Sequence, residues 1–309
     1  MFKFQKILTG LVVLGHLVAS ISVMATEQEH EPNDKFGQAL GINGQSVYAG
    51  TLETSSGYDL DYYKVVIEEN GILTVNLGVD SSLDEIVKPY ATGYELSIHS
   101  GTIDNLIKRS NDALYRDVYI FKDHEFKIGL PKGEYFIKLR SNNRDVWKLQ
   151  YQLSFNFSPS ELTELEPNDG FKTANTIKMN SIIEARRGLR FGTPGDYYVL
   201  DVDSPQAVTV LLEQPNFAET YRRNTGGDKI SPVTFKVTVY DEGQHQIVFF
   251  PGFNAKNSKE LKFDIDLAQG KYFFRVECKS KMPGGAMRKV VKDAEYKLSV
   301  SSQRKSHVE

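Results

Sequence analysis

The chain of 309 residues repeats itself, and this repetition limits its possible folds more than any other feature. When residues 29–63 are placed over residues 164–198 at a fixed offset of 135, 13 of the 35 positions are identical without a gap. About two identities would be expected by chance. The shared pairs include Glu29/Glu164, Glu31/Glu166, Pro32/Pro167, Asn33/Asn168, Asp34/Asp169, Phe36/Phe171, Ala39/Ala174, Gly57/Gly192, Asp61/Asp196, Tyr62/Tyr197 and Tyr63/Tyr198. Such a long period indicates two tandem domains and not a short-repeat solenoid.

Later segments also match, with offsets that grow along the chain. Residues 133–139 resemble 270–276, and residues 151–155 resemble 296–300, at offsets of 137 and 145. The insertions therefore fall in connecting loops. We predict a signal peptide over residues 1–25, a first domain over 26–158 and a second domain over 159–309.

Each repeat reads as a series of short alternating strands. The chain holds 24 Gly and 11 Pro together with 16 Tyr and 18 Phe, a composition that favours strands and turns over long helices. In the first repeat the predicted strands are 47–53, 61–67, 71–77, 94–99, 118–121, 135–140 and 148–155. A helical turn is predicted within 101–116 and another within 214–224. No βαβ alternation is visible, so we predict an all-β protein of two antiparallel β-sandwiches.

The first 25 residues have the pattern of a secretion signal. Lys3 and Lys6 precede an almost wholly apolar stretch, and residues 23–25 place small residues where a signal peptidase cleaves. The alternative is an uncleaved membrane anchor, since about 18 apolar residues can just span a bilayer. Gly10 and Gly15 weaken that alternative. We expect a secreted or periplasmic protein with no stable membrane insertion after cleavage.

Charge and cysteine content argue against a nucleic-acid-binding protein and against a fold held together by intrachain disulfides. The formal net charge is 37 − 40 = −3, and it becomes 35 − 40 = −5 after loss of the signal, so we expect no nucleic-acid partner. Cys278 is the single cysteine and cannot form an intrachain disulfide. It alternates onto the same strand face as Phe274 and Val276, which indicates a buried core thiol.

The residues that carry the duplication are mostly acids and amides. The first copy holds five carboxylates and one amide, contributed by Glu29, Glu31, Asn33, Asp34, Asp59 and Asp61. If these groups converge, their repulsion is relieved by a hard divalent cation, and calcium takes six to eight oxygens from such mixed ligands. The set contains no His or Cys, which argues against zinc and copper. The alternative is a group of solvated turns in which Asp and Asn cap loop amides.

The second copy repeats most of this set. It contributes Glu164, Glu166, Asn168, Asp169 and Asp196. Pro194 stands where the first copy has Asp59. We therefore predict two Ca2+ sites, of which the second binds more weakly or relies on carbonyl groups and water.

Together these motifs resemble a known family. The chain reads Glu-x-Glu-Pro-Asn-Asp, then Asp-x-Asp-Tyr-Tyr, then Gly-x-Tyr and a closing Tyr-x-Leu strand, which is similar to the bacterial pre-peptidase C-terminal domain and to related collagen-binding domains of clostridial collagenases. The resemblance covers nearly all of residues 27–303, twice over. It implies a jelly-roll-like sandwich, usually appended to secreted peptidases, with calcium held between the N-terminal acids and the Asp-x-Asp loop. Here no peptidase domain precedes the repeats.

No catalytic motif is visible, so we predict that the chain is not an enzyme. The segment 124–128 begins His-Glu but lacks the second His of a zinc-protease helix. The chain has no nucleophile elbow, phosphate loop or dinucleotide fingerprint. Paired acids for glycoside hydrolysis can come from distant parts of a chain, so composition leaves that alternative open.

Two other features could bind a partner. One tyrosine of each pair, Tyr62/Tyr63 and Tyr197/Tyr198, is expected to point outward, where it could stack on a polymer or pair across exposed strands. The basic segment 279–292 could be a polyanion site, although a solvated hairpin loop is the simpler interpretation.

Our leading hypothesis is a secreted, non-catalytic protein whose two calcium-stabilised sandwiches bind an extracellular protein or polysaccharide. The alternative hypothesis is a stand-alone accessory factor, a folding helper or modulator, of a secreted protease.

Overall fold

The computed structural model describes eleven stretches of the chain: 25–44, 46–53, 59–79, 94–102, 106–109, 124–141, 148–187, 195–214, 233–251, 260–280 and 294–303. The predicted signal peptide except its last residue, the predicted strand at 118–121 and most of the segments 214–224 and 279–292 lie outside these residues. Within the described part, no helix has the length and apolar character needed to cross a membrane.

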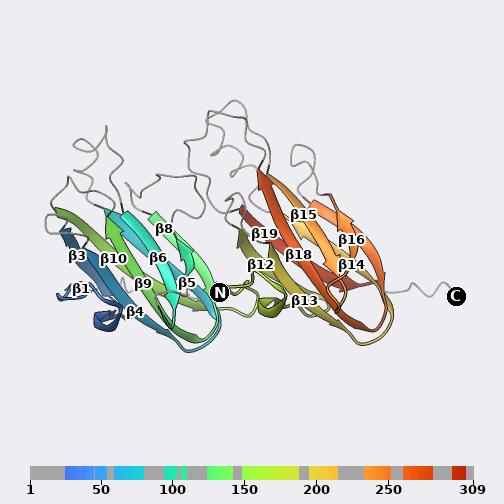
Figure 1. Ribbon diagram of the computed structural model, residues 1–309, viewed down its shortest axis with the longest axis horizontal. Helices are drawn as coiled ribbons and strands as arrows, with labels where there is room; N and C mark the ends of the chain where they lie inside the picture. The colour runs from blue at the N-terminus through green and yellow to red at the C-terminus, as the bar shows by residue number, and fades with distance from the viewer. Residues whose placement is uncertain are drawn as a thin grey trace, which may run out of the picture.

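The described chain is almost entirely β-structure, as predicted (Figure 1). The strands up to residue 159 are β1 (Ala25–Gln28), β2 (Leu40–Gly41), β3 (Ser46–Glu53), β4 (Leu60–Ile67), β5 (Gly71–Val79), β6 (Tyr94–Ser100), β7 (Leu106–Arg109), β8 (His124–Leu130), β9 (Gly133–Ser141) and β10 (Lys148–Pro159). The later strands are β11 (Asn175–Thr176), β12 (Ser181–Arg187), β13 (Asp196–Val202), β14 (Gln206–Glu213), β15 (Val233–Tyr240), β16 (Gln246–Phe250), β17 (Glu260–Leu267), β18 (Gly270–Ser280) and β19 (Ala294–Ser302). Two 3-10 turns are η1 (Phe36–Gln38) and η2 (Phe171–Thr173).

These strands form four sheets that pack as two sandwich-like domains. The first sandwich has the orders β1-β3-β10-β5-β8 and β2-β4-β9-β6-β7. The second sandwich has the orders β12-β19-β14-β17 and β11-β13-β18-β15-β16. Figure 1 shows them side by side, with β8 of the first sandwich facing β12 of the second. The second sandwich therefore repeats the strand order of the first, except that no named strand takes the place of β1.

The strand register repeats as well. β2 runs parallel to β4 with Leu40 opposite Tyr63, and β11 runs parallel to β13 with Asn175 opposite Tyr198. Both pairs are separated by the offset of 135 found in the sequence. The duplicated acidic segments, which lie just before β2 and β11, are thereby held in the same place relative to β4 and β13.

Each sandwich has its own hydrophobic core, formed where alternating apolar residues of its two sheets meet. One core runs from Tyr48 to Phe155 and the other from Ile177 to Val300. Both tyrosines of each Tyr-Tyr pair are buried, because η1 places Phe36 against Tyr62 and η2 places Phe171 against Tyr197. Tyr62 and Tyr197, the tyrosines that point outward from the strands, are therefore covered by phenylalanine rings. This favours a structural role for them over stacking on a polymer.

The predictions from sequence missed some strands. A helical turn was predicted within 101–116, and the described residues 106–109 of that range form β7, which pairs with β6. A four-residue edge strand is too short to show a clear alternation, so the pairing partner decides its structure. β8 was also missed, and its first residues are the His-Glu segment 124–128, which is a strand and not a helix. β10 continues to Pro159, and the boundary between 158 and 159 stays a prediction.

The two cores can be tested separately by truncating a buried side chain. We expect Leu212→Ala to lower the free energy of unfolding by about 2–5 kcal/mol, because Leu212 is fully buried and its removal leaves a cavity in the second core. The control is Ile182→Ala, since Ile182 is 45% exposed and its loss should cost less than about 0.5 kcal/mol. Denaturant unfolding measures both, and equal losses would contradict this assignment of the core.

Candidate metal centres

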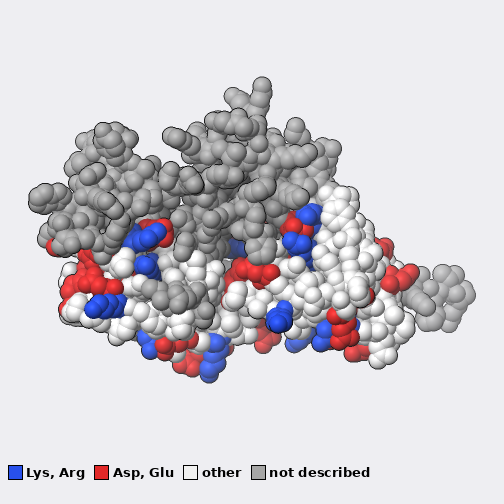
Figure 2. All heavy atoms as spheres, in the orientation of Figure 1, with Lys and Arg blue, Asp and Glu red and all other residues white. Residues whose placement is uncertain are grey.

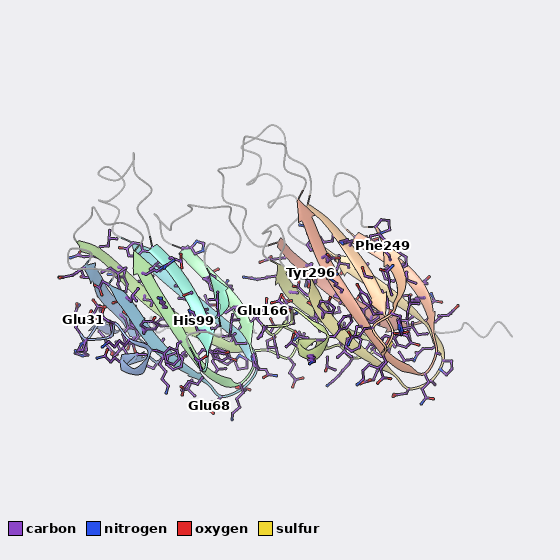
Figure 3. All side chains as sticks on the ribbon, viewed as in Figure 1. Glu31, Glu68, His99, Glu166, Phe249 and Tyr296 are labelled. Atoms are coloured by element: carbon purple, nitrogen blue, oxygen red, sulfur yellow. The ribbon has the colours of Figure 1, made fainter. Side chains whose placement is uncertain are left out.

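The first acidic cluster forms where the segment after β1 crosses the start of β4. Asn33 is held there through its main chain, because its carbonyl oxygen accepts a hydrogen bond from the Tyr62 amide at 3.1 Å. The Glu31–Pro32 peptide bond is cis. Figure 3 places Glu31 at the end of the first sandwich farthest from the second, and acidic atoms gather at that end in Figure 2. The segment thus places its acids against Asp61 of β4.

Three carboxylates converge in this cluster. One oxygen each of Glu29, Glu31 and Asp61 lie within 4.8 Å of one another. Asp61 and Asn33 are both fully buried (0% exposed), whereas Glu31 is exposed. The predicted convergence of the N-terminal acids with the Asp-x-Asp strand is therefore present for these residues.

The amide of Asn33 faces the same carboxylates. One of its two terminal positions lies 3.1 Å from Asp61 Oδ1 and 3.2 Å from Glu31 Oε2. With nitrogen at that position, the amide donates to both carboxylates. With oxygen there, the cluster becomes a group of oxygen atoms that needs protons or a cation between its members.

Asp34 and Asp59 lie beside this group and outside the set of three. Asp59 accepts a hydrogen bond from the Glu53 amide and interacts with the Asp34 side chain. Both belong to the predicted ligand set. The structure pairs them with each other at the rim of the cluster.

A pair of tyrosines, which the sequence did not assign to the site, closes the cluster from inside the core. Tyr151 Oη lies 2.8 Å from Glu29 Oε2, and it also contacts Asp61 Oδ2 and the Tyr63 hydroxyl. Gly50 makes room for this contact, because a Cβ at that position would lie 2.4 Å from the Tyr151 hydroxyl and 2.5 Å from Glu29 Oε2. The closing Tyr-x-Leu strand was the only signal in the sequence that could have pointed to Tyr151.

Burial raises the pKa values of three acids in this cluster, Asp61, Asp59 and Glu31. The pKa of Asp61 rises to about 9, mainly because the side chain is desolvated and then because the Glu29 carboxylate lies close by. Burial likewise raises the pKa of Asp59 to about 6, with a further contribution from Asp34. The pKa of Glu31 is also raised, first by burial. Without a cation, Asp61 therefore holds a proton at neutral pH.

The second acidic cluster follows the same plan between η2, β12 and β13. The Glu166–Pro167 bond is cis, and the Asn168 carbonyl oxygen accepts from the Tyr197 amide at 2.9 Å. Glu164 is 4% exposed and Asp196 is 3% exposed. Burial raises the pKa of Glu164 well above its usual range, and the Asp196 charge raises it further. Asp169 is exposed, as Asp34 is in the first cluster.

The two clusters differ in their tyrosine contacts. Ala185 stands where the first sandwich has Gly50, since it lies opposite Tyr296 as Gly50 lies opposite Tyr151. Here the buried glutamate, Glu164, accepts from Tyr198 at 3.1 Å, and Tyr296 donates to Asp196 at 2.7 Å. In the second sandwich, the Ala185 methyl group takes the position that is empty at Gly50 in the first sandwich, where Tyr151 reaches Glu29.

The amide of Asn168 is incompletely satisfied. Its nitrogen donates to Glu164 Oε1 at 2.7 Å, but its oxygen has no hydrogen-bond partner although the residue is 0% exposed. An unpaired buried oxygen costs about 1–3 kcal/mol unless something satisfies it. Among the described residues, three carboxylates meet within 4.8 Å in the first cluster and not in the second.

A serine and a histidine lie next to each other on β6. Ser97 Oγ lies 2.9 Å from His99 Nε2, and both side chains are buried on the same strand, β6. The adjacent acid, Glu95, forms an ion pair with Arg140 at 2.8 Å. Glu95 is thus engaged by a cation. This arrangement gives no independent sign of catalysis.

Comparison with known proteins gives distant similarities. No family model matches the chain. The chain is 22% identical over 256 residues to Collagenase ColT of Clostridium tetani, an alignment that includes 80% of this chain and 22% of the collagenase. The chain therefore spans about a fifth of the length of that relative.

Two solved structures illustrate the structural similarity. The pre-peptidase C-terminal domain of a collagenase from Bacillus anthracis matches 41% of this chain and 93% of its own, at 19% identity and a TM-score of 0.27. Tandem CBM51 modules of a family 98 glycoside hydrolase from Streptococcus pneumoniae match 81% of this chain and 86% of their own, at 11% identity and a TM-score of 0.24.

The raised pKa of Asp61 predicts how stability depends on pH when cations are removed. The folded protein binds a proton at Asp61 up to about pH 9, whereas the unfolded chain releases it near pH 3.8. Because the native state binds more protons between these values, the free energy of unfolding should fall as pH rises from about 4 to about 9. Denaturant unfolding in chelator measures this fall, and Asp61→Asn should remove the part due to Asp61. Equal pH dependence in the variant and the wild type would contradict the assignment.

Proposed function

We propose that this chain is a secreted or periplasmic, non-catalytic binding protein whose two sandwiches are each stabilised by a calcium ion. The observation that carries the proposal is the convergence of Glu29, Glu31 and Asp61 within 4.8 Å around the buried amide of Asn33. Such a group is stable at neutral pH only if protons or a cation compensate its charge.

The residues of the first cluster fit calcium. Its potential ligands are all oxygens, and calcium prefers six to eight oxygens from carboxylates, amide carbonyls and water. Glu29, Glu31, Asp61 and the Asn33 oxygen would form the inner part of the site. Asp34 and Asp59, which lie at its rim, would supply further ligands directly or through water. When bound, the ion supplies positive charge that replaces the proton on Asp61.

The second cluster fits calcium less completely. The unpaired oxygen of Asn168 would be one ligand, and the carboxylates of Asp196 and Glu166 lie close enough to Glu164 to raise its pKa. Asp169 would take the place of Asp34. No acid corresponds to Asp59, so we expect the second site to have the lower affinity.

The binding role rests on the fold and on the distant relative. A β-sandwich whose N-terminal segment is ordered by a calcium site is a rigid support for binding an extracellular protein or polysaccharide. Two linked sandwiches gain avidity if both contact one polymer. The similarity to Collagenase ColT favours a protein such as collagen among the possible targets. Retention of the mature protein on insoluble collagen, chitin or cell-wall material tests this role. Absence of retention on all three would contradict it.

An accessory role for a secreted protease is the second candidate. It is favoured by the fact that the relative is a collagenase of which this chain covers only 22%. Co-purification from culture fluid separates the two roles. A stoichiometric protease partner would support the accessory role, and recovery of the chain bound to polymer without a protease would support adhesion.

Calcium should stabilise the mature protein through the two clusters independently. At a hundredfold excess over the dissociation constant, each occupied site adds about 2.7 kcal/mol to the free energy of unfolding. Asp61→Asn should abolish the larger calcium-dependent shift in melting temperature, and Asp196→Asn the smaller one, because each removes one charge from one cluster. Calorimetry with calcium and with chelator measures both shifts. If neither variant differs from the wild type in its response, the acids are turn residues.

A further inference from the structure

The segment that connects the two sandwiches forms hydrogen bonds on both of its sides. On one side it runs parallel to β12, where the Glu184 amide donates to the Leu162 carbonyl at 2.6 Å and the Glu164 amide donates to the Glu184 carbonyl at 2.9 Å. On the other side the Glu166 amide donates to the carbonyl of Gly129, in β8 of the first sandwich, at 2.9 Å. Residues 162–166 therefore lie between the edge strands of two different sheets.

This segment takes the position that β1 has in the first sandwich. β1 runs parallel to β3 with Gln28 opposite Ala49, and Thr163 lies opposite Glu184, which is the same pair shifted by 135 residues. The segment therefore completes the edge of the second sandwich and also contacts the edge of the first. It carries Glu164 and Glu166 of the second acidic cluster, so this cluster lies at the junction, where Figure 3 places Glu166.

Gly129 permits this close approach. A Cβ at that position would lie 1.7 Å from the Glu164 carbonyl oxygen and 3.0 Å from Thr163 Oγ1. The first contact is with main-chain atoms, which a rotamer change cannot relieve. Every other residue type would push the connecting segment away from β8.

The equivalent edge strand of the second sandwich, β17, has no glycine at the position of Gly129. β8 pairs with β5 with Leu130 opposite Gly71, and β17 pairs with β14 with Leu267 opposite Gln206. The residue before the leucine is Gly129 in β8 and the exposed Asp266 in β17. Of these two equivalent positions, only Gly129 leaves room for the main chain of a neighbouring segment at this distance.

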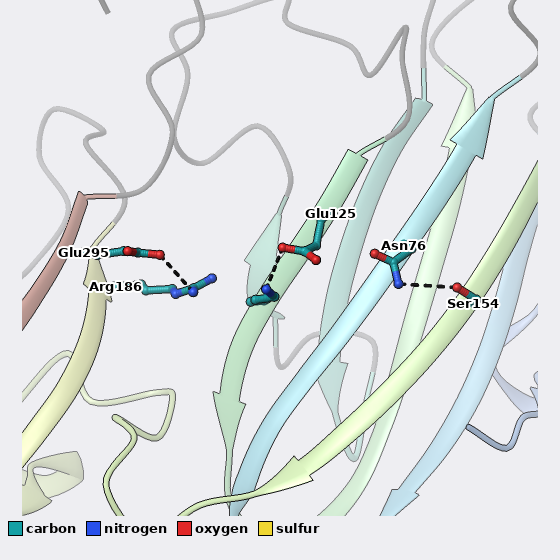
Figure 4. A network of polar contacts seen from close by, with 6 residues as sticks. Asn76, Glu125, Ser154, Arg186 and Glu295 are labelled. Atoms are coloured by element: carbon teal, nitrogen blue, oxygen red, sulfur yellow. Dashed lines mark hydrogen bonds and ion pairs between the residues drawn. The ribbon is translucent and has the colours of Figure 1, made fainter. Parts of the chain in front are cut away.

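Charged residues surround the junction. A groove of about 290 Å³ is lined by residues of β8, of the connecting segment, of β12 and of β19. Two ion pairs lie nearby, Lys127 with Glu125 at 2.7 Å and Arg186 with Glu295 at 2.9 Å. Figure 4 shows Glu125 and the pair of Arg186 with Glu295. Both ion pairs form within one sandwich, whereas the hydrogen bond from the Glu166 amide to the Gly129 carbonyl joins the connecting segment to the first sandwich.

We propose that the edge of β8 around Gly129 is a docking surface for the acidic segment 162–166, and that this docking is coupled to cation binding at the second cluster. The segment then acts as a strand shared by the two sandwiches, and a cation held by Glu164 and Glu166 fixes the strand that joins them. The coupling, but not the docking, rests on the calcium site proposed above.

Gly129→Val tests the docking, with Asp266→Val as the matched control at the equivalent edge position and Gly129→Ala as a milder variant. We expect the wild type and Asp266→Val to give the same small-angle X-ray scattering profile. Both Gly129 variants should give a larger radius of gyration, with separate thermal transitions for the two sandwiches. Unchanged profiles for the Gly129 variants would overturn the docking surface.

The coupling is measured in an Asp61→Asn background, in which only the second cluster binds calcium. There Gly129→Val should weaken calcium binding about tenfold or more, measured by calorimetric titration, and Asp266→Val should leave it unchanged. Altered scattering with unchanged affinity would overturn the coupling and keep the docking. Absence of calcium binding with Gly129 intact would refute the second cation site, and the scattering comparison would still decide the docking.

Discussion

Each sandwich buries carboxylates close to one another, although every buried charge costs free energy of desolvation. Asp61 and Asp196 stand at the start of central strands and are almost completely removed from solvent, each beside a second buried or half-buried glutamate. Such a group must be compensated by protons, by hydrogen-bond donors or by a cation. The tyrosine hydroxyls from β10 and β19 supply only part of this compensation, because one hydroxyl donates a single hydrogen.

The same constraint explains why the N-terminal segment of each sandwich lies where it does. The segment brings its own acids and an asparagine to the buried aspartate, and its main chain hydrogen-bonds to the strand that carries this aspartate. In the first sandwich it continues from β1, and in the second it is the connection between the sandwiches. A site that orders this segment therefore also determines how firmly the segment is attached, and in the second sandwich how the two halves meet.

Several strands and the acidic clusters could be predicted from the sequence, because residues that recur in both copies of the repeat stand out from those that match by chance. The strands at 47–53, 61–67 and 71–77 followed from alternation. The recurrence of Glu29, Glu31 and Asp61 singled these acids out, and the family resemblance implied that they converge, as they do. The role of Tyr151 could not be predicted, because alternation shows that a tyrosine faces inward and not which acid it meets. Gly129 and β7 were missed for a related reason, since their structure depends on partners distant in sequence.

Anomalous diffraction from crystals grown with calcium tests whether the first cluster binds the cation. We expect an anomalous peak at about 2.3–2.6 Å from oxygens of Glu29, Glu31 and Asp61, with the Asn33 oxygen turned towards it. Absence of a peak, with the Asn33 nitrogen donating to both Asp61 and Glu31, would show that the cluster holds no calcium.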